Sequence, residues 1–288
     1  MTTTTELPTS DPAAVPELAG AVPTSPPSHL GTALRHTWYL SGRRLHAVLR
    51  QPAFIAVGLI QPVIWLFLFG ELFRKVVDIP GFAAGGSYLA YLIPGIVAMS
   101  AMNGNMWAGM NAMEEIDRGT LNRFLVSPAR RVALMNANVV EQAVTTTVQT
   151  VIILVLGLAG GARYPGGIAG AAVVVVASIL IGAVFGALSN AVGMLVRQRE
   201  AIIGINVFFM LPLTFLSSAF LPATLMPGWM QAIAECNPLN WAVVAGRSAL
   251  NAHTDWAAVG IRCAGLLALA VVCVTISVAT FRSYQKSV

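Results

Sequence analysis

A short polar segment in the middle of the chain, residues 114–128, is the strongest candidate for a functional site. It lies between two long apolar runs and reads EEIDRGTLNRFLVSP. The segment starts with acidic residues, carries the apolar side chains Leu121, Phe124 and Leu125 further on, and closes with Pro128. Acidic residues suit the positive end of a helix dipole, and proline stops a helix. These features are compatible with a short stiff helix that carries an apolar knob for a partner protein, but the residue types alone are more typical of a plain polar loop.

Residues that could catalyse a reaction or bind a metal ion form no recognisable site. None of the four histidines has the spacing of a metal ligand set. Ser189 and Ser217 lack the G-x-S-x-G context of a hydrolase nucleophile. Cys236, Cys263 and Cys273 include no C-x-x-C pair; a disulfide between the first two stays open, and free thiols are favoured. We expect no catalytic residue and no metal, so an intramembrane enzyme is a weak alternative.

The sequence also offers no obvious source of energy of its own. No stretch matches the phosphate loop G-x-x-x-x-G-K-[ST], so we expect no cofactor on this chain. Ion-driven carriers need ionisable groups within the membrane. The apolar runs supply Glu141 and little else. A role for Glu141 in moving protons stays open, which leaves an ion-coupled carrier as a further alternative.

The composition is that of a membrane protein. Charged residues make up 10% of the chain and hydrophobic residues 56%, whereas about 25% of an ordinary soluble domain is charged. The net charge of +5 comes without any run of Lys and Arg interleaved with aromatic residues. Basic residues of a membrane protein gather beside the inner leaflet. We therefore expect lipid, and no nucleic acid, as a partner.

Six membrane spans are expected, because about 20 apolar residues cross the hydrocarbon layer as a helix. Their expected ranges are 54–73, 88–110, 132–158, 168–196, 201–221 and 257–281. The connections and chain ends on one side, which include the segment 114–128, hold twelve Lys and Arg residues, and the other side holds five, with Arg262 of the last span counted there. The positive-inside rule therefore places both termini and this segment in the cytoplasm.

The residues before the first span divide into two parts. Residues 1–31 are rich in proline and lack an apolar run, which predicts a disordered cytoplasmic tail. Residues 32–51 place Trp38 and several Leu and Val residues at helical spacing, with arginines on the other face. That pattern predicts an amphipathic helix in the inner membrane interface, at the start of a membrane domain covering residues 32–288.

The segment 114–128 resembles a known motif. Its pattern E-x-x-x-G-T-L-x-x-x-x-x-S-P is similar to the cytoplasmic segment after the second span in permeases of the ABC type-2 exporter family. The resemblance implies a coupling helix over residues 113–128 that docks on a separate ATPase. The residues that carry over are Glu114, Glu115, Arg118, Gly119, Thr120, Leu121, Phe124, Leu125 and Pro128. The alternative is a plain polar loop whose arginines obey the positive-inside rule.

A second resemblance lies between the fifth and sixth spans. Residues 222–250 are apolar but broken by Pro and Gly, which is typical of re-entrant or interfacial helices. The family pattern W-x-x-x-x-x-x-x-N-P-L and its later arginine are matched by Trp229, Asn237, Pro238, Leu239 and Arg247. The family implies an amphipathic elbow helix at residues 32–51 and two short extracellular helices here. Within the family, RGTLNRFLVSP looks most like the daunorubicin-resistance type of drug-efflux permease.

Several side chains inside the expected spans are candidates for a substrate route. The family uses the second and fifth spans at the centre of a dimer, which points to Asn103, Asn105, Asn206, Phe208, Phe209 and Phe215. Large soft side chains suit an amphipathic molecule that is held by burial of its surface. The alternative for each residue is ordinary packing or a hydrogen bond between helices.

These observations together predict an all-α polytopic membrane protein of the bacterial cytoplasmic membrane. The resemblance implies the transmembrane subunit of an ABC exporter, paired with a second permease copy or homologue and with two copies of an ATPase that binds ATP and Mg. The expected substrate is a small amphipathic drug or lipid-like molecule. Export of a polysaccharide or lipid-linked glycan is the alternative within this class.

Overall fold

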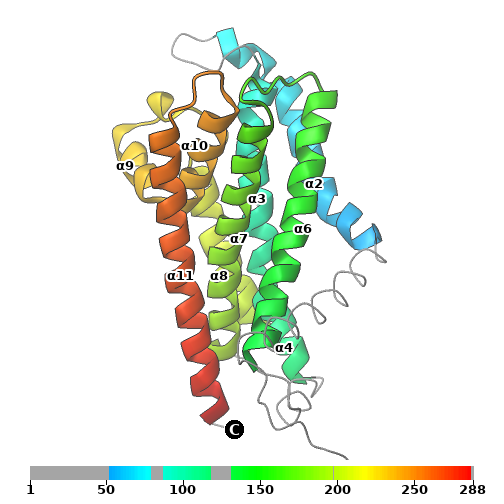
Figure 1. Ribbon diagram of the computed structural model, residues 1–288, viewed down its shortest axis with the longest axis vertical. Helices are drawn as coiled ribbons and strands as arrows, with labels where there is room; N and C mark the ends of the chain where they lie inside the picture. The colour runs from blue at the N-terminus through cyan, green and yellow to red at the C-terminus, as the bar shows by residue number, and fades with distance from the viewer. Residues whose placement is uncertain (1–51, 79–86, 118–130, 197, 287–288) are drawn as a thin grey trace, which may run out of the picture.

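The computed structural model describes residues 52–78, 87–117, 131–196 and 198–286. Within these ranges the chain is helical and contains no strand, as its apolar runs predict (Figure 1). The predicted tail (1–31), the predicted elbow helix (32–51) and residues 118–128 of the predicted coupling helix lie outside the described residues.

The longer helices follow the apolar runs of the sequence, and short helices fill the connections. In chain order the elements are α2 (Pro52–Leu72), η1 (Arg74–Asp78), α3 (Tyr88–Met106), α4 (Ala108–Asp117), α6 (Arg131–Ala159), α7 (Gly167–Val196), α8 (Arg199–Phe215), η2 (Ala223–Leu225), α9 (Gly228–Cys236), α10 (Pro238–Leu250) and α11 (Trp256–Lys286).

Three stretches of the described chain are long and apolar enough to cross a membrane: Val139–Ala159 in α6, Gly167–Val196 in α7 and Trp256–Thr280 in α11. Ala56–Leu72 in α2 is a shorter apolar helix. The 19 residues of α3 include two asparagines and two tyrosines, and α8 has 17 residues. The full set of six spans therefore stays a prediction.

Two expected spans differ from the helices that form. The expected second span, residues 88–110, breaks at Trp107 into α3 and α4. The expected fifth span, residues 201–221, ends at Phe215. The early end of α8 has a local reason: residues 216–221 bend away before Pro222 and supply polar groups to hydrogen bonds with α10. The break at Trp107 depends on distant residues.

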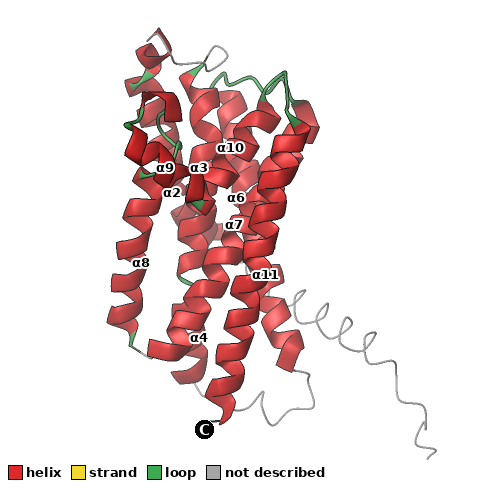
Figure 2. Cartoon of the chain, turned by 90° about the vertical axis from the view of Figure 1, so that its left-hand side faces the viewer, coloured by secondary structure: helices red, strands yellow, loops and turns green. Residues whose placement is uncertain are grey.

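The helices run side by side along the long axis, and α7 lies in the middle of the bundle (Figure 2). It packs against α3, α4, α6, α10 and α11. Small residues of α7 allow this close approach: the side chain of Asn105 lies over Gly182, and that of Gln142 over Gly186. Close contacts of this kind, rather than burial of apolar surface from water, hold helices together in lipid.

The connections alternate between the two ends of the bundle. The α6–α7 turn and the α10–α11 connection lie at one end, whereas α4, the start of α8 and the C-terminal end of α11 lie at the other (Figure 1). The helical pair α9–α10 lies toward the first of these ends. This alternation agrees with the predicted chain path. We call the end that contains α9 and α10 the hairpin end, and the other end the α4 end.

Candidate functional site

At the α4 end, the structure describes only the beginning of the predicted coupling segment. Glu114 and Glu115 belong to the last turn of α4. Of the predicted coupling helix, 113–128, the residues up to 117 form the end of α4, which begins at Ala108, so these carboxylates lie at the end of a described helix. The rest of the segment, Arg118 to Pro128, lies outside the described residues.

At the hairpin end, the N-P-L motif forms the junction between α9 and α10. Asn237 is the N-cap of α10, and its Oδ1 accepts from the Leu239 N–H at 2.9 Å. Pro238 occupies the first turn of α10, where its missing N–H leaves no hydrogen bond unmade. Leu239 is fully buried. Each residue of the motif thus has a separate physical role in starting the second short helix.

The same asparagine also closes the end of α8. Its Nδ2 donates to the carbonyl of Leu213 at 2.7 Å and to that of Leu216 at 3.0 Å. The last carbonyls of a helix have no partner within it, and in apolar surroundings they need another donor. Asn237 therefore fixes α9 and α10 to the end of the fifth expected span.

Arg247, on α10, reaches across to α3. Its Nη2 donates to the Ser218 carbonyl at 2.8 Å and to the Tyr91 carbonyl at 3.3 Å. Its guanidinium carbon lies 3.5 Å from the centre of the Tyr91 ring, close enough for a cation–π contact. The Tyr91 hydroxyl donates to the Ser218 carbonyl at 3.1 Å. Arg247 therefore holds together α10, α3 and the residues after α8.

Three members of this network were not singled out from the sequence: Tyr91, Ser218 and Asn240. Asn240 Oδ1 accepts from Ser218 N at 3.0 Å and from Ser218 Oγ at 2.6 Å, and its Nδ2 donates to the Ala234 carbonyl at 2.9 Å. The position of Asn240, three residues after Asn237 at the start of a helix, was the available signal. We call Tyr91, Ser218, Asn237, Asn240 and Arg247 the hairpin network.

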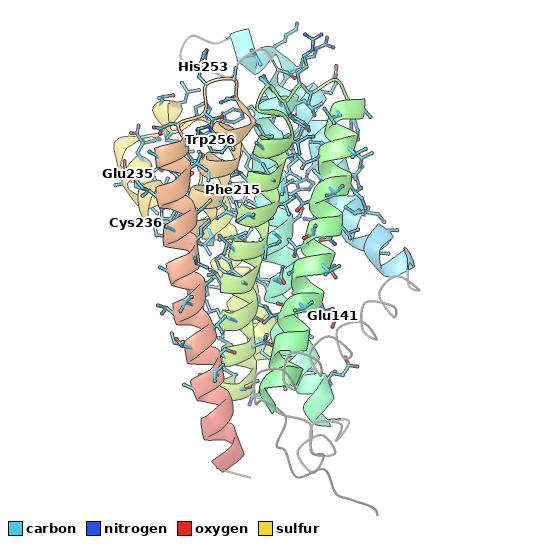
Figure 3. All side chains as sticks on the ribbon, in the orientation of Figure 1. Glu141, Phe215, Glu235, Cys236, His253 and Trp256 are labelled. Atoms are coloured by element: carbon cyan, nitrogen blue, oxygen red, sulfur yellow. The ribbon has the colours of Figure 1, made fainter. Side chains whose placement is uncertain are left out.

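Trp229, the first residue of the family motif, is not part of the hairpin network. It lies on α9 with 62% of its surface exposed. Glu235, Cys236, His253 and Trp256 lie in the half of the bundle toward the hairpin end (Figure 3). An exposed tryptophan suits the boundary between lipid and water, where its ring is buried and its N–H stays hydrated.

The candidate route residues are not brought together in a single chain. Asn105 Nδ2 donates to Thr146 Oγ1 at 3.1 Å and to the Ala101 carbonyl at 2.7 Å. Asn206 is buried and donates to the Met106 carbonyl at 2.6 Å. In contrast, Asn103 Oδ1 is buried and has no hydrogen-bond partner among the described residues.

The three phenylalanines of the candidate route lie on the outside of α8. The exposed fractions of Phe208, Phe209 and Phe215 are 70%, 51% and 59%, and Phe215 is the last residue of this helix. Their rings lie against one another or against Phe220 rather than in the core. We call these three residues the aromatic face of α8.

The described residues contain no group of three or more His, Cys, Asp or Glu side chains that could hold a metal ion. The three cysteines are free thiols. Glu141 is half-buried on α6, in the half of the bundle nearer the α4 end (Figure 3).

Comparison with known proteins identifies the class. Residues 35–251 match the ABC-2 type transporter family, and the chain belongs to this family. The matched range includes the segment 114–128 and the hairpin network. The resemblance predicted from those two motifs is therefore confirmed.

Individual relatives carry the names of drug-resistance and transport permeases. The chain is 27% identical over 237 residues to the daunorubicin resistance ABC transporter permease protein DrrB1 of Streptomyces coeruleorubidus, covering 81% of this chain and 79% of that one. It is 29% identical over 211 residues to a putative transport permease, ycf38, of Porphyra purpurea, covering 73% and 71%. It is 24% identical over 161 residues to the probable doxorubicin resistance permease DrrC of Mycobacterium tuberculosis, covering 56% and 58%.

Proposed function

We propose that this chain is the transmembrane subunit of an ATP-driven exporter that moves an amphipathic drug or lipid-like molecule out of a bacterial cell. The observation that carries the proposal is the family match over residues 35–251. The drug-resistance names of two relatives support the substrate class. The chain is the permease, and a separate ABC ATPase binds and hydrolyses ATP with Mg.

The proposed contact with the ATPase is the segment 113–128. Leu121, Phe124 and Leu125 form an apolar knob that enters a cleft on the ATPase, and the charged residues before them orient the segment. A stiff element is needed because the ATPase can exert force only on a part that it grips. Glu114 lies at the end of α4, so the described helix leads directly into this contact.

Export requires two permeases and two ATPase subunits in this proposal. The aromatic face of α8 is the surface of the chain that meets the substrate or the second permease. Soft aromatic side chains accept amphipathic molecules of varied shape, because they bind by area of contact and not by fixed hydrogen bonds. Asn103, whose buried Oδ1 has no partner within the described chain, supplies a hydrogen-bond acceptor on α3.

The proposed orientation places both termini and the α4 end in the cytoplasm and the hairpin end outside. The alternation of connections between the two ends supports six spans. The excess of Lys and Arg in the connections at the α4 end supports the direction. In this frame α9 and α10 enter the outer leaflet and turn back, and the hairpin network satisfies their polar groups there.

Co-expression with the cognate ATPase tests the proposal. The purified chain alone should hydrolyse no ATP, and the two proteins together should form a complex that survives detergent and size-exclusion chromatography. Hydrolysis should appear only with the complex and should disappear when the catalytic base of the ATPase is replaced. Steady hydrolysis by the isolated chain, or no complex under any detergent tested, would contradict the assignment.

A further inference from the structure

The backbone leaves the helical hydrogen-bond pattern between α3 and α4. In a continuous helix each N–H donates to the carbonyl four residues earlier. Here the Met110 N–H donates to the Trp107 carbonyl at 3.0 Å, three residues back. The Gly109 N–H leaves its own helix and donates to Ser189 Oγ at 3.1 Å. The break therefore frees backbone groups that must find partners on other helices.

Two side chains from different helices bind the carbonyl at the end of α3. The hydroxyl of Ser189, on α7, donates to the Met106 carbonyl. The amide Nδ2 of Asn206, on α8, donates to the same oxygen at 2.6 Å. Both side chains are buried, with 3% and 5% of their surface exposed. A backbone carbonyl left unpaired in such surroundings would be costly, so these donors fix the position of the break.

Close packing reinforces this junction. A Cβ atom placed on Gly109 would lie 2.2 Å from the Ser189 carbonyl oxygen, and one placed on Gly193 would lie 2.8 Å from the Gly109 carbonyl oxygen. Only glycine allows backbones to approach so closely. The first turn of α4 therefore packs directly on α7. A displacement of α4 must also displace Ser189, which is hydrogen-bonded to Gly109.

The junction lies between the two functional surfaces of the chain. On one side, α4 leads to Glu114 and to the segment proposed to dock on the ATPase. On the other side, Asn206 belongs to α8, two residues before Phe208 on the aromatic face. Residues 106, 189 and 206 thus form the described link from the docking segment to α8.

We propose that Ser189 and Asn206 are positioning residues that clamp the α3–α4 break and pass a displacement of the docking segment into α8. The inference rests on the proposed function, because it assumes an ATPase that moves this segment. Closure of the ATPase shifts α4, the clamped Met106 carbonyl carries that shift to Asn206, and α8 changes the placement of its aromatic face. Loss of the clamp separates ATP hydrolysis from movement of α8.

Variants that remove the two donors test the clamp in the complete complex of permease and ATPase. Ser189→Ala removes one donor and adds no volume. Asn206→Leu removes the other and keeps the side chain similar in size. Ser178→Ala is the matched control, because Ser178 is also a buried serine of α7 and its Oγ donates only to the Val174 carbonyl of its own helix, at 2.6 Å.

The decisive readout is the movement of α8 between nucleotide states. If the two donors served only folding, an assembled variant complex would show the same movement as the parent. Spin labels are attached at Gly204→Cys on α8 and Leu267→Cys on α11, in a chain without its native cysteines. A Cβ at Gly204 meets nothing within 4 Å, and Leu267 is 53% exposed. The distance between labels is measured in the nucleotide-free complex and in the complex trapped with ADP and vanadate. ATP hydrolysis and export are measured on the same preparations.

The two nucleotide states should give different label distances in the parent and in Ser178→Ala. Complexes with either single donor variant should keep the ATPase subunit bound. Their export per ATP hydrolysed should fall by about tenfold, in line with the loss of one buried hydrogen bond. The double variant should lose both export and the distance change. If the double variant fails to assemble, Ser189→Ala alone decides the question.

Two other outcomes would contradict the account in different ways. An unchanged distance shift and normal export in the donor variants, or no shift in the parent while it exports, would overturn the clamp and leave the proposed function intact. A parent complex without ATP-driven export would instead overturn the proposed function.

Discussion

The guanidinium of Arg247 lies over the ring of Tyr91, 3.5 Å from its centre, and also donates to the Tyr91 backbone carbonyl. The two residues are 156 positions apart in the sequence. The Arg247 side chain therefore donates to the Tyr91 carbonyl on α3 and also packs on the Tyr91 ring. This contact joins the short helix α10 to the long helix that precedes the docking segment.

Replacing Arg247 by Met should loosen the hairpin end. The change removes the charged 2.8 Å donor to the Ser218 carbonyl, which keeps only the Tyr91 hydroxyl, and it removes the cation–π contact. A hydrogen bond from a charged group contributes about 1.5–3 kcal/mol, so the melting temperature of the detergent-purified protein should fall by several degrees. Arg262→Met on α11 is the control, because Arg262 Nη1 donates only within its own helix, to Ala258. Equal melting temperatures for the two variants would show that the hairpin network contributes nothing.

Gly95 marks a second close approach, between α3 and the residues after α8. A Cβ at this position would lie 2.7 Å from the Ala219 carbonyl oxygen and 3.0 Å from the Ala219 Cα. Because backbone atoms cannot yield as a flexible side chain can, Gly95→Val should lower folded yield and thermal stability markedly, by about 1–3 kcal/mol or more. Gly204→Ala, which meets open space, should be neutral or slightly stabilising. A Gly95→Val protein as stable as Gly204→Ala would show that this contact is not tight.

The proposed orientation predicts which turns reach the outside of the cell. A cysteine at Pro165, exposed in the α6–α7 turn, should react with an impermeant thiol reagent in whole cells, in a chain lacking its native cysteines. A cysteine at Ser127 should react only after the cells are opened. The reverse labelling pattern would contradict the proposed orientation, because it would place the segment 114–128 outside the cell, where no ATPase could reach it.

Long apolar runs were read well from the sequence. The fourth span was expected at residues 168–196, and α7 covers Gly167–Val196. An uninterrupted run of this length has one way to satisfy its backbone in lipid, which is a helix. The start of α10 was equally readable, because Asn237 and Pro238 are the residue types that favour an N-cap and the first helical turn.

Features that depend on distant partners were not readable. No proline marks the break at Trp107, and the glycines and asparagines near it lower helix propensity without giving its position. The break is stabilised by Ser189 and Asn206, which follow about 80 and 100 residues later. In the same way, Arg247 was noted as part of a motif, but its partner Tyr91 lies on another helix. Sequence patterns report local geometry and give little information about which side chain will meet a freed carbonyl.

The apolar knob proposed to enter the ATPase can be removed without touching the membrane helices. Leu121→Ala combined with Phe124→Ala should leave the permease inserted but weaken attachment of the ATPase by about 2 kcal/mol or more, as truncation of buried interface anchors does. Pull-down of the ATPase and its affinity for the purified permease measure this change. Leu267→Ala, on the exposed face of α11, is the matched control and should bind normally. Full binding of the ATPase and normal export by the double variant would show that the segment is only a basic loop.

Transport itself tests the central claim most directly. Inside-out membrane vesicles that contain the permease and its cognate ATPase should accumulate an amphipathic fluorescent drug such as daunorubicin when ATP and Mg are added. Vesicles with either protein alone should not, and collapse of the proton gradient should leave the uptake in place. Uptake by the permease without its ATPase, or uptake that follows the proton gradient and ignores ATP, would contradict an ATP-driven exporter.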